Sequence, residues 1–151
     1  MLAFSRTKWV GVEKPAPDTY LAHGVLEDNI YGLELDVTVK TPEYKITSAA
    51  GKMRRFTTPE CPRAVPVLQE AIGVCLTEAN LISLVNRRIG REGCRHFANL
   101  LLECCDAILR CAFFERWAEA KKQGIDPGDY AKERLPLVPA LKNTCLALKM
   151  E

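Results

Sequence analysis

The hydrophobic pattern of the chain changes near its middle, from a repeat of two residues to a helical repeat. Over residues 33–40, Leu and Val alternate strictly with charged residues and Thr, which is typical of a strand with one buried face. Residues 41–43 form a short turn that suggests a hairpin, and Gly51 suggests a β-bulge beyond it. Weaker strand signals lie at residues 8–12, 20–26 and 44–56.

The middle of the chain predicts two helices from their end signals. Pro59 and Pro62 suit the entry of the first helix, where a missing N–H costs little, and Gly73 can end it. Thr77 can cap the second helix, and Gly90 can end it. Both segments carry apolar residues at helical spacing, so we expect each to bury one face.

A third and longest helix is predicted from about Glu92–Cys94 to Lys122, with Gly124 as its stop. Two neighbouring apolar stripes predict that its first five turns are deeply buried. One stripe consists of Leu101, Cys105, Ile108 and Ala112, and the other of Leu100, Cys104, Ala107, Cys111 and Phe114.

Strands followed by helices predict an α+β fold, with an antiparallel sheet of three to four strands and three helices on one face. We expect residues 1–125 to form a single domain. Residues 126–151 form a C-terminal extension in which two prolines at 135–139 exclude a regular helix. Its apolar residues are predicted to pack on the domain or on a second copy; they are Leu135, Leu137, Val138, Leu141, Leu146 and Leu148.

Composition narrows the class of protein. The 151 residues are 48% apolar and 26% charged, which is ordinary for a globular chain. The net charge of +2 gives no electrostatic footprint for nucleic acid, so we expect no nucleic-acid partner. The apolar start is too short for a secretory signal, and no apolar run is long enough to cross a membrane. We therefore expect a cytoplasmic protein with reduced thiols.

The unusual feature is seven cysteines beside only two histidines. Three cysteines lie on the apolar face of the long helix, where a free Cys is usually core, and Cys75 and Cys145 have no partner at ligand spacing. The chain has no Cys-x-x-Cys, no glycine-rich phosphate loop and no hydrolase motif. Cys61 and Cys94 remain as candidates for chemistry.

Both remaining cysteines lie where a helix is predicted to start, and His96 follows Cys94 closely. A helix N-terminus stabilises a thiolate, and two thiols with an imidazole supply most of a four-ligand zinc or iron site. The alternative is a buried turn thiol and a structural histidine, since 33 residues separate the two cysteines. Arg54 and Arg55 either bind an anion or form a solvated strand end.

Several segments together resemble the bacterial domain-of-unknown-function family 2889. That family is similar in its Pro-x-Cys entry to the first helix and its Gly-Cys-Thr-His-Leu start to the last, over about residues 6–113. Where the family usually has a His-Asp-Met-like step, Tyr31-Gly32-Leu33 stands here, and its Thr is Arg95. The segments that carry the resemblance are Val25–Asp28, Tyr31–Val39, Met53–Phe56, Pro59–Cys61 and Gly93–Phe97.

The order of elements also resembles the iron–sulfur scaffold fold of the IscU and NifU N-terminal type. By that resemblance, Cys61 and Cys94 match the second and third scaffold cysteines. The first ligand position would fall between Asp28 and Tyr31, where no Cys stands. The resemblance implies a mononuclear site with mixed ligands, Tyr31 supplying oxygen, or a descendant of the fold without metal.

Three hypotheses follow. The first is a small metal-binding or iron–sulfur-related accessory protein that holds zinc, iron or a cluster through Cys61, Cys94, His96, Asp28 and Tyr31. The second is a small-molecule-binding protein or enzyme with a Cys94–His96 thiol site, where Arg54, Arg55 or Arg95 binds an anionic ligand. The third is a metal-free module that self-associates through the charged end of the long helix and the C-terminal tail.

Overall fold

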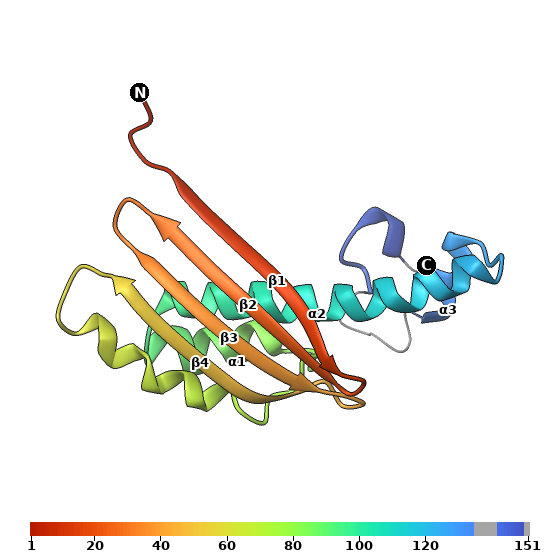
Figure 1. Ribbon diagram of the computed structural model, residues 1–151, viewed down its shortest axis with the longest axis horizontal. Helices are drawn as coiled ribbons and strands as arrows, with labels where there is room; N and C mark the ends of the chain where they lie inside the picture. The colour runs from red at the N-terminus through yellow and green to blue at the C-terminus, as the bar shows by residue number, and fades with distance from the viewer. Residues whose placement is uncertain (135–141, 150–151) are drawn as a thin grey trace.

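The computed structural model describes residues 1–134 and 142–149, and four antiparallel strands form its sheet. The strands pair in chain order, so each neighbouring pair is a hairpin and β1 and β4 are the edges. This meander, with the helices Leu81–Val85 and Arg95–Lys122 behind one face (Figure 1), confirms the α+β fold. The strands are β1 (Arg6–Ala16), β2 (Thr19–Asp28), β3 (Gly32–Lys40) and β4 (Lys45–Arg55).

The helical half differs in detail from the prediction. The expected first helix is two short 3-10 helices, because Pro66 has no N–H to continue the hydrogen-bond ladder of the first one. The expected second helix starts four residues later than Thr77, at Leu81, and passes from α-helical to π-helical geometry. The helical elements are η1 (Cys61–Ala64), η2 (Pro66–Ala71), α1 (Leu81–Val85), η3 (Asn86–Arg91), α2 (Arg95–Lys122), α3 (Pro127–Arg134) and η6 (Leu146–Leu148).

The β-bulge predicted at Gly51 is wrong, since Gly51 pairs regularly with Leu35. The extra residues of β4 are Thr47 and Arg54, where the register against β3 shifts. Gly51 is needed for a different reason: a Cβ there would lie 2.3 Å from Leu68 and 3.0 Å from the Phe97 ring. Gly51 thus marks a close approach of the helical layer to the sheet.

Helix α2 crosses the inner face of the sheet and forms the main core contact (Figure 1). The first predicted stripe is buried throughout, and so are Leu100 and Cys104 of the second. Phe114 of the second stripe is 62% exposed instead. The other members of the core that α2 joins include Leu26, Leu33, Leu35, Val37, Ile46, Leu68 and Ile89.

Two lysines of β1 tie this edge strand to α2. Lys8 and Lys14 lie on the inner face, and their Nζ atoms are each 2.7 Å from a carboxylate oxygen, of Glu103 and Glu115 respectively. Tyr20 donates a hydrogen bond of 3.0 Å to the same Glu115. The pairs are half-exposed, so each contributes at most about 1 kcal/mol to stability. Their role is to fix the angle of α2 against the first hairpin.

The described part of the C-terminal extension contacts the domain at two points. The buried Tyr130 ring of α3 lies 5.4 Å from the Phe113 ring, and Leu148 packs against the core. Leu146 does not pack and is 91% exposed. Residues 135–141, with the other apolar residues of the prediction, lie outside the described part. No helix among the described residues is long and apolar enough to cross a membrane.

We expect Gly51→Ala to lower the free energy of unfolding by about 1–3 kcal/mol, because buried Leu68 and Phe97 must move to admit the methyl group. Urea unfolding measures the change. Gly90→Ala is the matched control, since its new Cβ would meet Ala98 at an ordinary 3.4 Å. Equal stability of the two variants would show that the sheet and α2 are not in close contact at Gly51.

Candidate functional site

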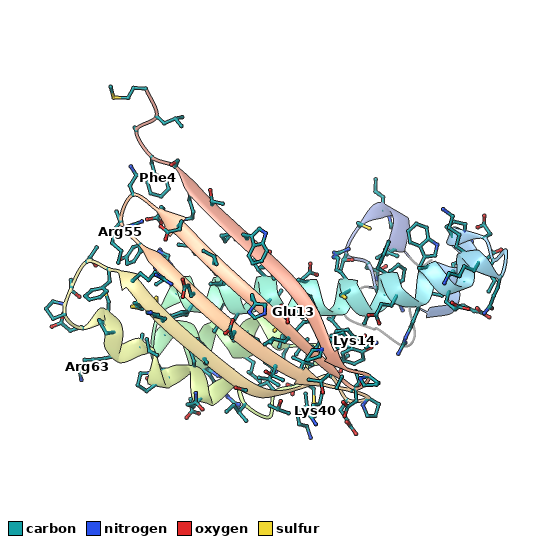
Figure 2. The ribbon with its side chains drawn as sticks, viewed as in Figure 1. Phe4, Glu13, Lys14, Lys40, Arg55 and Arg63 are labelled. Carbon is teal, nitrogen blue, oxygen red and sulfur yellow. The ribbon has the colours of Figure 1, made fainter. Side chains whose placement is uncertain are left out.

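Three segments meet at one end of the sheet: the β2–β3 turn, the loop after β4 and the start of α2. Five residues from them form an unbroken chain of side-chain contacts, which we call the thiol corner: Cys61, Thr57, Tyr31, His96 and Cys94. Figure 2 shows this end of the sheet by Phe4 and Arg55, with Lys14 and Lys40 at the opposite end. The fold therefore brings together both predicted cysteines, the histidine and Tyr31.

Asp28 shapes the β2–β3 turn that carries Tyr31. One carboxylate oxygen accepts hydrogen bonds from the backbone N–H groups of Ile30, at 2.7 Å, and Tyr31, at 2.6 Å. The side chain is fully buried. Burial favours the neutral carboxyl, but these two bonds and the guanidinium of Arg6 outweigh it and lower the pKa of Asp28 to about 2.

Arg6 occupies the second carboxylate oxygen of Asp28. Its Nη2 lies 2.7 Å and its Nε 2.8 Å from Oδ2, and the two residues face each other in the β1–β2 register. With both oxygens engaged, Asp28 organises the turn and has no oxygen that is free of protein partners. No pattern in the sequence indicates Arg6, because its role depends on the register of β1 against β2.

The Cys61 thiol lies within 3.6 Å of two hydroxyl oxygens, those of Thr57 and Thr58. The hydrogen bond from the Thr58 hydroxyl, followed by bonds from the Thr58 backbone and the Thr57 hydroxyl, lowers the pKa of Cys61 to about 7. From the sequence we expected the start of a helix to stabilise the Cys61 thiolate. The structure attributes this stabilisation to hydroxyl groups, since η1 is only four residues long. Two threonines just before the cysteine were the available signal.

Tyr31 connects the two halves of the thiol corner. Its hydroxyl oxygen is 3.2 Å from the Thr57 hydroxyl, and its ring centroid is 4.2 Å from that of His96. The ring contact is tilted by 36°, within the usual range for packed aromatic rings. Tyr31 thus contacts Thr57, beside Cys61, through its hydroxyl group, and His96, beside Cys94, through its ring.

His96 has a neighbour at each ring nitrogen. Nδ1 is 3.8 Å from the Cys94 sulfur, and Nε2 is 3.5 Å from Nη2 of Arg6. The imidazole is partly buried, and this burial, with the positive charges of Arg6 and Arg95, lowers the pKa of His96. Asp28 opposes the shift. His96 is consequently held mainly neutral at pH 7.

The predicted anion-binding arginines lie around the same end of the sheet with different environments. Arg54 is ion-paired with Glu34, and Arg55 pairs with Glu27 at 2.7 Å while it also donates to backbone carbonyls of the β2–β3 turn. Arg95, the first residue of α2, is exposed. The guanidinium that contacts the His96 ring is that of Arg6, which the sequence did not indicate.

All seven cysteines lie in the described part of the chain, and all are free thiols. Burial raises the pKa of Cys104 and of Cys105 to about 12, which confirms that they are core residues. Within residues 1–134 and 142–149, no group of three or more His, Cys, Asp or Glu side chains is placed to hold a metal ion. The thiol corner is thus a chain of contacts and not a preformed metal centre.

Residues 15–110 match the family model described as Protein of unknown function (DUF2889). The chain belongs to this family. The DUF2889 match contains both cysteine motifs and the whole thiol corner, whereas Arg6 lies before it. No curated protein matches the chain, and neither does a solved structure. A relationship of this DUF2889 protein to the iron–sulfur scaffold fold is therefore not shown.

The low pKa of Asp28 means that its contribution to the stability of the DUF2889 fold can be tested by varying the pH. Its pKa is about 2 in the folded chain and about 3.9 when unfolded, so the carboxylate stabilises the fold above about pH 3.9. That contribution is lost as the pH falls towards 2. We expect Asp28→Asn to cost about 1.5–3 kcal/mol at pH 7 and to weaken the acid dependence below pH 4.

Urea unfolding at pH 7 and between pH 4 and 2 measures both effects of Asp28→Asn. The matched control is Asp106→Asn, which removes an exposed carboxylate that pairs with Arg110 one turn along α2. We expect this control to change stability by less than about 0.5 kcal/mol. A parallel acid dependence for wild type and Asp28→Asn would exclude the assigned role of Asp28.

Proposed function

We propose that the protein is a thiol-dependent small-molecule-binding protein that forms a bond to an electrophilic ligand through Cys61. The observation that carries this proposal is the half-exposed Cys61 sulfur within 3.6 Å of two threonine hydroxyls. The same hydroxyls lower its pKa to about 7, so about half of the thiol is ionised at neutral pH. An accessible thiolate is the reactive form of cysteine.

The surroundings of Cys61 support a nucleophilic role over a packing role. The hydroxyls of Thr57 and Thr58 can donate to the thiolate, and the Tyr31 hydroxyl is one contact further along. When a ligand with a polarised double bond reacts, a lone pair of the thiolate sulfur forms the new bond as the π bond of the ligand breaks. The displaced electron pair stays on the ligand and takes a proton from water, and the thiol proton has already passed to water. Cys104 and Cys105 are fully buried with raised pKa values, so they do not compete.

Cys94 and His96 form the second half of the proposed site. The His96 ring lies against the Tyr31 ring, and Cys94 beside His96 adds a second sulfur, a polarisable group suited to soft ligands. The arrangement favours a small ligand that spans the Tyr31 hydroxyl and the His96 ring. This proposal keeps the thiol chemistry first assigned to Cys94 but moves the reactive sulfur to Cys61.

We expect iodoacetamide to alkylate Cys61 with a pH midpoint near 7, because that is where its thiolate forms. Thr58→Val removes the hydroxyl that contributes most to the low pKa and should slow Cys61 labelling at pH 7 by about threefold or more. Peptide mass spectrometry after timed labelling resolves each cysteine separately.

Thr47→Val is the matched control for Thr58→Val. It removes a threonine hydroxyl from the far end of β4, where the hydroxyl donates to the Thr38 carbonyl. The exposed Cys145 provides an internal reference for reagent access. If Thr58→Val and Thr47→Val label Cys61 at the same rate at pH 7, the Thr58 hydroxyl is not the source of its reactivity.

A metal-binding or iron–sulfur-related role stays a second proposal, supported by the adjacent Cys94 sulfur and His96 imidazole. It requires Cys61 and Cys94 to move to a common ion, since the described residues hold no ready group of ligands. Elemental analysis after anaerobic purification tests it. Near-stoichiometric zinc or iron that is lost in Cys61→Ser and Cys94→Ser would support it, and under about a tenth of an equivalent after reconstitution would exclude it.

A further inference from the structure

The hydrogen on the His96 ring can be located from its neighbours. Arg6 presents Nη2 at 3.5 Å from His96 Nε2, and a guanidinium has only donors and remains charged in proteins. Nε2 must therefore offer its lone pair at this contact. A neutral imidazole carries one N–H, so a bare Nε2 leaves the hydrogen on Nδ1.

The protonated nitrogen then faces Cys94. Its sulfur lies 3.8 Å from His96 Nδ1, within reach of a weak N–H···S hydrogen bond. The Tyr31 ring, 4.2 Å away between centroids, packs against the imidazole and limits its rotation. Flipping the ring by 180° would place Cε1–H at Arg6 and Cδ2–H at Cys94, so the contacts of both ring nitrogens would be lost.

Arg6 is held in place from its other side. Asp28 binds it through two contacts to one oxygen, at 2.7 and 2.8 Å, while the other oxygen of Asp28 is fixed by the backbone of the β2–β3 turn. Four residues therefore form a directed series from Asp28 through Arg6 and His96 to the Cys94 sulfur.

We propose that Arg6 is a positioning residue that fixes His96 as the Nδ1–H tautomer, so that His96 donates a hydrogen bond to the Cys94 sulfur. This inference rests on the proposed function only for its use, in which Cys94 and His96 form the second half of the site. His96 is thereby a donor to Cys94 and not its base.

The charged groups around His96 agree with a neutral ring. Arg6 and Arg95 oppose a positive charge on the imidazole, and Asp28 favours it but is already paired with Arg6. The nearby thiol of Cys94 and the phenol of Tyr31 are the other ionisable groups in contact with the ring. Above neutral pH the His96 ring is therefore neutral, and its state is described by which of its two nitrogens carries the hydrogen.

Nitrogen-15 NMR of the ring nitrogens tests the assignment in the full chain, which contains only two histidines. His23 lies between Asp36 and Glu13, which raise its pKa, and His23→Gln identifies the remaining signals as those of His96. At pH 7.5 we expect wild-type His96 to show a protonated Nδ1 and an unprotonated Nε2. The opposite pattern in wild type would overturn the proposal by itself.

Two variants assign the effect to Arg6. Arg6→Gln should shift the population towards the Nε2–H tautomer, and Arg6→Lys should retain Nδ1–H because it keeps a cationic donor. An unchanged wild-type pattern in a folded Arg6→Gln variant would overturn the role of Arg6. If Arg6→Gln fails to fold, loss of the Nδ1–H pattern in folded Arg6→Lys would count against cation control, and its retention would support it.

The same spectra separate this inference from the proposed function. Cys61→Ser abolishes the proposed bond-forming sulfur but should leave the His96 pattern unchanged, because Cys61 does not contact the ring. Slow alkylation of Cys61 with an Nδ1–H His96 would refute the proposed function alone. Rapid alkylation of Cys61 with an Nε2–H His96 would refute the tautomer assignment alone.

Discussion

The fold depends on how closely α2 can approach the backbone of the sheet. Two positions decide this: a Cβ at Gly24 would lie 2.8 Å from the Cys104 sulfur, and one at Gly51 would meet Leu68 and Phe97. Without side chains at these positions, the helical layer packs directly on the strands. The buried cysteines of α2 fit the same requirement, because a thiol fills less space than a leucine side chain. The depth and direction of α2 then determine where its first residues emerge.

Those first residues emerge beside the β2–β3 turn, which Asp28 ties to β1. Its buried carboxylate joins the turn backbone to Arg6 of the first strand, so three segments share one charged group. A buried charge is tolerated only when it is paired and hydrogen-bonded, which makes this arrangement sensitive to any change in the turn. The thiol corner depends on this arrangement, because the turn that Asp28 holds carries Tyr31. Asp28, which organises the turn, therefore lies next to the cysteines of the thiol corner but is not one of the reactive side chains.

Periodicity and end signals in the sequence were sufficient for the sheet, the long helix and the face that α2 buries. They were insufficient where a local interaction overrides the pattern, as at Pro66, which divides the first helix, and at Thr47 and Arg54, which are inserted into β4. Cys61, Cys94 and His96 could be selected because they stand at element boundaries, and Tyr31 could be selected from the family resemblance. Arg6 could not, because a register between strands is a property of pairs. Thr57 and Thr58 stand just before Cys61 in the sequence. We nevertheless expected a helix start, and not their hydroxyls, to stabilise the Cys61 thiolate.

The inward-facing lysines of β1 have a consequence for assembly. β1 is an eleven-residue edge strand, and an exposed edge of that length is a template for pairing with another chain. At the other edge, backbone bonds between Ile46 and the 73–74 segment cover the start of β4. On β1 the protection is electrostatic: a strand added beside Lys8 and Lys14 would have to place its own inward residues next to two ammonium groups already committed to α2. The ion pairs that orient the helix therefore also guard the sheet against growth by strand addition.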